Sequence, residues 1–189
     1  MKHTVIELEE RLPLSKRNLG KDIDNDIVRK KRALKQIFLS DPAILETLHN
    51  PDLDVECPED FFNVNILDYI KLTPTQDEMR NFLCYEFQDK YLIEHNTKIK
   101  NQYLTIVCLV QEKDMETNYD MNRADLLAHL VKENLNLSNA LGIQLLIQED
   151  RASIMDNKYY TRTLIFKIKA PNDVQNGGAG KYDRFARGR

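Results

Sequence analysis

One ten-residue segment, QYLTIVCLVQ (102–111), constrains the fold more than any other part of the chain. Leu104, Ile106 and Cys108 alternate along it, together with Val110, and would share one face of a β-strand. The other face is nearly as apolar. Strands that are apolar on both faces belong in the middle of a sheet that is covered on both sides. The segment therefore predicts a central, doubly covered strand.

Other segments predict the partners of this strand. RNFLCYEFQDKY (80–91) and YYTRTLIFKIK (159–169) alternate as strands do, and GIQLLIQ (142–148) is a shorter candidate strand. Residues 149–158 are polar and predict a link between the last two strands. A helical pattern runs to about Leu135, with Asp120 as its expected N-cap.

Helical signals also precede the first strands. Apolar residues recur from Ile27 to Phe38 at helical spacing, and Asp41 before Pro42 is typical of a helix start, which predicts a short helix to about Leu48. Residues 61–72 fit either a strand or a short helix. The order of elements predicts an α+β fold: a mostly antiparallel sheet with N-terminal helices and one crossover helix packed on it.

Composition and the positions of proline and glycine predict the domain organisation of the 189 residues. Residues 1–22 are expected to form an N-terminal arm, residues 23–171 a single α+β domain, and residues 172–189, with several glycines, a flexible basic C-terminal tail. No apolar run approaches the roughly 18 residues of a membrane span, and no signal-peptide pattern opens the chain. These features predict an unsecreted protein without a membrane partner.

Catalytic and cofactor motifs are missing from the sequence. It contains no phosphate-binding glycine loop, no G-x-S-x-G elbow and no histidine pair four residues apart. Cys57, Cys84 and Cys108 are too widely spaced for a zinc site and are expected to be buried, reduced thiols. The sequence thus predicts a non-enzymatic protein with no catalytic residues, no cofactor and no bound metal.

Two alternatives depend on charge. Asp156-Asn157-Lys158 is an acidic-x-Lys triplet of the kind that Mg²⁺-dependent nucleases use, but it lies in a predicted turn, and one triplet is fewer than chance would give. The basic tail, with Tyr182 and Phe185 interleaved, suggests a regulatory module that binds nucleic acid or protein. The run 29–32 is also basic, but consecutive helical residues cannot form one stripe, and Lys30 and Lys31 are expected to extend to solvent beside the apolar face. The net charge of −3 gives little long-range attraction to phosphate.

A family resemblance is found mainly in the second half of the chain. The succession TIVCLVQEKD, MNRADLLAHLVKENLNLSNALG, IQLLIQED and YYTRTLIFKIKAP resembles the strand–helix–strand–strand layout of tail-terminator and related neck proteins of tailed bacteriophages. The earlier stretches LKQIFLSDPAILETLHN and TPTQDEMRNFLCYEF are also similar to phage neck proteins, so the resemblance covers roughly residues 25–171.

The resemblance implies a structural virion protein of the head–tail junction. Such proteins form rings, commonly hexameric, that terminate the tail tube or dock it to the head connector. The implied partners are further copies of this chain and neighbouring neck, tail-tube or connector proteins, with at most incidental contact with packaged DNA. The implied location is the virion, assembled in the host cytoplasm.

Ring subunits meet through two different surfaces, so charges of both signs close together are candidate contacts. The candidates for self-association are Glu149, Asp150, Arg151, Lys158 and Arg162. Arg162 stands at a strand position that alternation directs inward. Two interpretations follow: it pairs with a neighbouring subunit's carboxylate, or it lies on an edge strand and reaches water.

Overall fold

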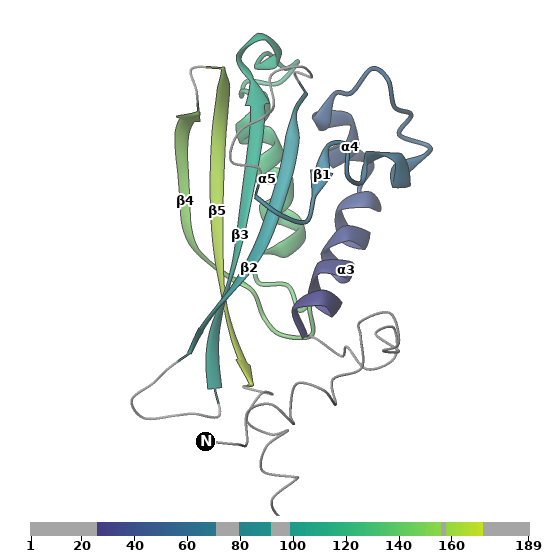
Figure 1. Ribbon diagram of the computed structural model, residues 1–189. Coiled ribbons are helices and arrows are strands. Elements are labelled where there is room, and N and C mark those ends of the chain that lie inside the picture. The colour runs from purple at the N-terminus through teal and green to yellow at the C-terminus, as the bar shows by residue number, and fades with distance from the viewer. Residues whose placement is uncertain (1–25, 71–79, 92–98, 156–157, 172–189) are drawn as a thin grey trace, which may run out of the picture.

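The computed structural model describes residues 26–70, 80–91, 99–155 and 158–171. Its centre is a five-stranded sheet with the strand order β1-β2-β3-β5-β4 (Figure 1). The strands are β1 (Ile66–Leu67), β2 (Phe82–Tyr91), β3 (Ile99–Gln111), β4 (Leu146–Met155) and β5 (Tyr159–Pro171).

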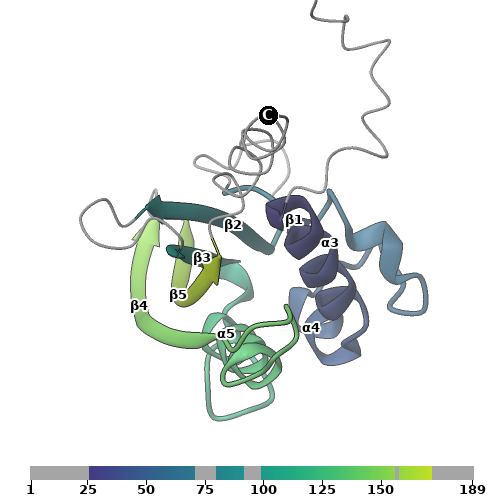
Figure 2. The same ribbon diagram turned by 90° about the horizontal axis from the view of Figure 1, so that it is seen from below.

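Helices lie against one face of this sheet (Figure 2). They are α3 (Asp26–Leu39), α4 (Pro42–Leu48) and α5 (Arg123–Leu135), with short 3-10 turns at Pro58–Phe61 and Glu112–Asp114. Except for the short parallel pair β1–β2, all strand pairs are antiparallel. The predicted α+β fold, with N-terminal helices and a crossover helix on a mostly antiparallel sheet, is confirmed.

The central position predicted for residues 102–111 is also confirmed. β3 pairs with β2 on one side and with β5 on the other along most of its length. Both β3 and β4 run antiparallel to β5, so they run parallel to each other with β5 between them. Parallel strands of one sheet need a crossover connection, and α5 provides it.

Two short side chains set the starts of α4 and α5. The carboxylate of Asp41 accepts a hydrogen bond from the Ala43 amide at 3.0 Å, with Pro42 at the first helical position. In α5 the cap is Asn122, which accepts from the Asp125 amide at 2.8 Å. The expectation that Asp120 caps this helix is therefore wrong by two residues, because Asn122 offers the same cap chemistry directly before Arg123.

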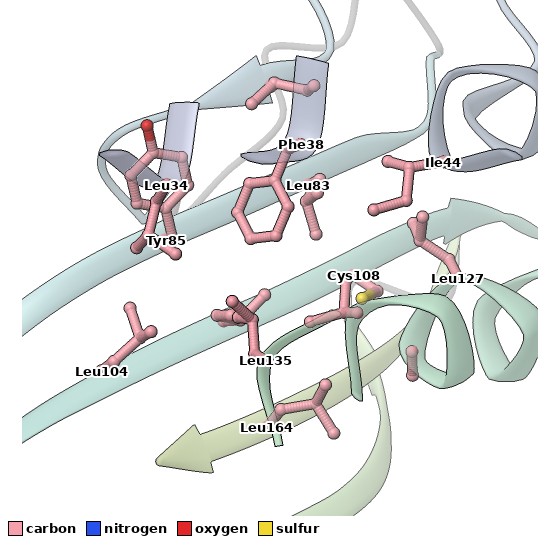
Figure 3. Packing of buried hydrophobic residues seen from close by; sticks show 14 of the residues in the cluster. Leu34, Phe38, Ile44, Leu83, Tyr85, Leu104, Cys108, Leu127, Leu135 and Leu164 are labelled. Atoms are coloured by element: carbon pink, nitrogen blue, oxygen red, sulfur yellow. The ribbon is translucent and has the colours of Figure 1, made fainter. Parts of the chain in front are cut away.

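The main hydrophobic core lies between the helices and the sheet (Figure 3). Phe38 of α3 packs edge-on against Tyr85 of β2, with ring centroids 5.6 Å apart. Burying each large apolar side chain is worth about 1.5–3 kcal/mol. The fully buried side chains that the three helices and β2, β3 and β5 contribute include Leu34, Phe38, Ile44, Leu83, Leu104, Cys108, Leu127, Leu135 and Leu164.

The second face of the sheet is buried only at one end. A smaller cluster there consists of Leu67, Phe82, Cys84, Val107, Leu109 and Tyr159. Tyr103, on the same face of β3 but farther along the strand, is half-buried. The predicted cover on both sides of β3 is thus right toward its C-terminal end and wrong toward Tyr103.

The last hairpin differs from its prediction. Gly142 has φ +77° and lies in a turn, its amide donating to the Asn139 carbonyl at 2.8 Å, so it does not begin a strand. β4 starts only at Leu146, and residues 149–155, expected to be a polar link, belong to it. An edge strand tolerates polar side chains because its outer edge meets solvent. A register shift between Ile147 and Glu149 marks a bulge in β4.

Residues 61–72 and the cysteines can also be compared with their predictions. In the described part of this segment, residues 61–70, Phe61 ends the 3-10 turn Pro58–Phe61 and the only strand is the two-residue β1. Cys84 and Cys108 are buried as expected, whereas Cys57 is exposed, and none of the three is in a disulfide. Along the described ranges, no helix is long and apolar enough to cross a bilayer. The predicted arm 1–22 and tail 172–189 lie outside the described residues.

Candidate functional site

The five candidate residues separate into two groups on the last hairpin. Asp150 of β4 and Arg162 of β5 face α5, where they join two helical side chains, Asp125 and Lys132. The Arg162 guanidinium donates to Asp150 at 2.5 Å and to Asp125 at 2.8 Å, and Lys132 donates to Asp150 at 2.8 Å. We call these four residues the Asp150 cluster.

Strand alternation places Arg162 on this face. It shares the face with Leu164 and Phe166, which are fully buried under α5, but lies nearer the first turn of that helix. The side chain of Arg162 is 25% exposed and that of Asp150 is 22% exposed. The hydrogen bond from Arg162, reinforced by Lys132, holds the pKa of Asp150 below its usual range despite partial burial. The same hydrogen bond raises the pKa of Arg162.

Both interpretations of Arg162 therefore change. The residue is not on an edge strand, because β5 lies between β3 and β4. Its carboxylate partners, Asp125 and Asp150, belong to its own chain. The inward direction that alternation predicted is correct, and a neighbouring subunit is not needed to satisfy its charge.

Glu149, Arg151 and Lys158 form the second group and are exposed. Glu149 is in register with Ile165 and Arg151 with Thr163, so both point away from the helices. The two form an ion pair at 3.3 Å, with side chains 44% and 64% exposed. The structure thus brings Asp150 and Arg162 together under α5 and leaves the other three at the surface of the hairpin.

A buried polar network, absent from the sequence predictions, lies under the first turns of α3. The Lys30 ammonium donates to Asp26 at 2.7 Å and to the Gln102 amide oxygen at 2.6 Å. Gln102 donates to Asp89 at 2.7 Å, and Lys100 donates to the same carboxylate at 2.8 Å. Lys30 is only 3% exposed and Gln102 is fully buried, so Lys30 does not extend to solvent as expected. We call these five residues the Lys30 network.

The charges of this network perturb one titratable group at its margin. Burial raises the pKa of Asp26, but the hydrogen bond and positive charge of Lys30 outweigh it, and the net pKa is below the usual value. The network joins α3 to the central strands and holds that helix on the sheet.

A third polar group joins α4 to the loop after β3. The Asp114 carboxylate forms an ion pair with Arg123 at 3.3 Å, accepts a hydrogen bond from the side-chain amide of Asn81, and contacts the His49 ring nitrogen at 2.8 Å. Arg123 also donates to the Asp114 carbonyl at 2.7 Å and to the Glu116 carbonyl at 3.0 Å. These bonds fix the 112–122 segment against the end of α4.

Signals for these groups existed in the sequence. Gln102 and Asp89 are polar residues at strand positions that alternation directs inward, and Lys30 lies four residues before buried Leu34 on the same helical face. Inward polar residues need partners, so such positions indicate networks even before a structure is known. Which partner each takes depends on strand register, which the sequence does not specify.

The described surface includes cavities of about 330, 460 and 420 Å³. One, lined by Ile154, Tyr159, Tyr160 and Met115, lies at the end of the last hairpin. Within the described ranges, no group of three His, Cys, Asp or Glu side chains could hold a metal ion. Asp156 and Asn157 of the proposed nuclease triplet lie outside those ranges, and Lys158 is exposed.

Comparison with known proteins gives a family. The sequence model of the YomW family matches residues 33–168, from α3 through β5. The chain belongs to the YomW family. The match includes all five candidate residues, so the hairpin of this YomW-family protein lies within the shared region.

Other comparisons add one structural similarity. No curated protein sequence matches this YomW-family chain. Among solved structures, it is similar to a chain of the "Virion of native gene transfer agent (GTA) particle", with a TM-score of 0.46 and 10% sequence identity. The similarity covers 75% of this chain and 94% of that chain.

Proposed function

We propose that this YomW-family protein is a structural virion protein at the head–tail junction of a phage-type particle. In that role it forms a ring that terminates the tail tube or docks it to the head connector, and it acts without catalysis. Its partners are copies of itself and neighbouring neck, tail-tube or connector proteins. It is assembled in the host cytoplasm and stays in the virion.

The observation that supports this proposal most is the layout of the second half of the chain. The sequence resemblance to tail-terminator proteins implies the succession strand, helix, strand, strand, and β3, α5, β4 and β5 have that succession in one sheet. A fold alone does not specify a function. Here the layout, the sequence resemblance and the polar surface of the last hairpin favour the same role.

The chemistry of the polar groups is consistent with a structural role. Asp150 and Arg162 bond to each other and to side chains of α5. Asp89 and Lys30 are held in the buried Lys30 network. Fully satisfied networks of this kind rigidify the fold that contains them. The proposed function thus depends on surfaces rather than on a reactive side chain.

Disruption of the gene in a host that produces the particles tests this proposal. The expected result is filled heads and separate tails in electron micrographs, with complementation by the intact gene restoring joined particles. Antibody labelling of complete particles is expected at the junction. Joined, infectious particles that lack the protein by mass spectrometry would refute the proposal.

The alternative, a regulatory module that uses the basic tail, predicts a different result. Lys167 and Lys169 of β5 lead toward residues 172–189, which lie outside the described part of the chain. Binding to nucleic acid would weaken steeply with salt and would be lost when residues 172–189 are deleted. Virion assembly would then be unaffected by that deletion.

A further inference from the structure

β4 ends the sheet and offers a free edge. Among the described strands, none pairs with its outer side (Figure 1). Every described side chain from Gln148 to Ile154 is exposed except the half-buried Asp150. A strand edge presents a row of backbone donors and acceptors that another strand can pair with.

The charges on this edge are arranged symmetrically about Asp150. Glu149 and Arg151 flank it on the outward face, and they carry opposite signs. If two β4 strands pair antiparallel with Asp150 opposite Asp150, Glu149 of each copy lies opposite Arg151 of the other. An isologous contact requires this self-complementarity, in which one residue meets another and the second meets the first. We propose that β4 pairs in this register with β4 of a second copy of this chain.

The Asp150 cluster removes the main obstacle to this register. Two carboxylates directly opposite in a strand pair, with Cβ atoms about 5 Å apart, would repel each other. In this chain Asp150 is already bonded to Arg162 and Lys132, at 2.5 and 2.8 Å. Each copy therefore brings a compensated Asp150 to the symmetry axis.

Apolar side chains lie at both ends of the strand. Leu146 is 44% exposed and Ile154 is 69% exposed, and each stands four residues from Asp150. The bulge between Ile147 and Glu149 leaves Leu146 on the outward face, in register with Lys167, whereas Ile154, in register with Tyr160, lies on the helix face. Pairing centred on Asp150 therefore does not stack these two side chains on each other, but it brings a second strand beside Ile154 and the apolar cavity next to it.

Edge charges and bulges can instead prevent pairing. Protective edges usually carry lysine or an inward-pointing charge of one sign, which repels any incoming strand. β4 carries one charge of each sign on its outward face, and its inward charge is neutralised by its own chain. The bulge of β4 lies between Ile147 and Glu149, at the margin of the contact, and residues 149–151 keep a regular register. These features favour attraction between copies.

The pairing goes beyond the proposed ring function. A ring closes through two different surfaces on each subunit, whereas the β4 contact joins two chains through the same surface. It would link two rings or two free subunits. The two proposals can therefore fail separately.

Charge reversal tests the register. In E149R both cross-strand pairs become Arg–Arg, and in R151E both become Glu–Glu, so we expect each variant to weaken self-association about tenfold in sedimentation equilibrium. An equimolar mixture of the two variants restores opposite charges in every pair and should associate as the original protein does. The double variant E149R/R151E should behave likewise. Failure of both the mixture and the double variant to recover association would overturn the proposal.

Cross-linking provides a second test that does not depend on strong association. In a C57S background, which removes the exposed native thiol, E149C protein is mixed with R151C protein under mild oxidation. A covalent dimer should form in the mixture in large excess over either variant alone, because residue 149 opposes residue 151. K169C, exposed on β5, replaces R151C as the control and should give no excess. Equal yields in all mixtures would overturn the proposal and identify β4 as a protected edge.

Failure of the β4 pairing and failure of the proposed virion function give different results in these experiments. If the cross-link fails while the protein still forms rings and is found in particles, only the β4 pairing is wrong. If the cross-link forms but particles lacking the protein are complete, the virion role is wrong and the pairing stands.

Discussion

The Lys30 network and the outward charges of β4 use the same chemistry in opposite surroundings. Lys30 is 3% exposed and bonds to Asp26 and Gln102, whereas Arg151 is 64% exposed and bonds to Glu149 at 3.3 Å. Removing one partner of a buried ion pair costs about 3–5 kcal/mol because it leaves an uncompensated charge. An exposed pair is worth only about 0–1 kcal/mol. Burial, not the presence of an ion pair, therefore separates the charges that hold the fold from those available for a partner.

The largest loss of stability is expected for a change in the buried Lys30 network. Lys30→Met keeps the apolar stem but removes the ammonium from Asp26 and Gln102, so we expect the free energy of unfolding to fall by about 3 kcal/mol. Urea denaturation followed by circular dichroism measures it. The control Arg32→Ala, exposed on the same helix, should change it by less than about 0.5 kcal/mol. Equal losses in both variants would mean that the network does not hold α3 on the sheet.

The Asp150 cluster is intermediate, because it is paired but partly exposed. Arg162→Met removes the bonds to Asp150 and Asp125 while Lys132 still compensates Asp150, so we expect a loss of about 2 kcal/mol. The same denaturation experiment measures it. Lys158→Met on the exposed hairpin is the control and should be nearly neutral. A loss below that of the control would show that the cluster adds nothing to stability.

Sequence reasoning succeeded where packing determines the pattern and failed where a partner does. Residues 102–111 are apolar on both faces. This pattern predicts a central strand because a strand covered on both sides needs apolar side chains on each face, and the structure places it there. Residues 149–155 were predicted to be a link because an edge strand has no such requirement. The inward direction of Arg162 followed from alternation. Its partners on α5 did not, since they depend on how the crossover helix packs.

Acid pH should reduce the difference in the free energy of unfolding between the original protein and the Arg162→Met variant. The pKa of Asp150 is lowered in the folded protein, chiefly by Arg162, so the unfolded chain binds more protons and stability rises with pH. This contribution is present above the ordinary carboxylate pKa of about 4 and is lost as pH falls through the folded value. The stability gap between the original protein and Arg162→Met should therefore stay nearly constant from pH 7 to about pH 5 and shrink as the pH falls below about 4.

The depressed pKa of Asp26 provides a comparison within the same titration. Its carboxylate remains near Lys30 in Arg162→Met, so that variant should still lose some stability in acid. Denaturation curves at several pH values measure both effects. A stability gap that stays constant down to about pH 2 would contradict the assignment of the Asp150 shift to Arg162.

The smallest change in stability is expected for the exposed charges of β4. Arg151→Ala removes a surface ion pair with Glu149, so unfolding of the dilute protein should change by less than about 0.5 kcal/mol. The proposed β4 pairing adds a second expectation: at concentrations where the protein associates, the variant should dissociate more readily than the original. Denaturation measured at low and high protein concentration separates the stability of the single subunit from the contribution of association, because only the contribution of association depends on concentration. A large loss in the dilute protein would mean that Arg151 supports the subunit's own fold. The weakened association expected of the charge-reversal variants would then have to be attributed to misfolding rather than to a lost contact.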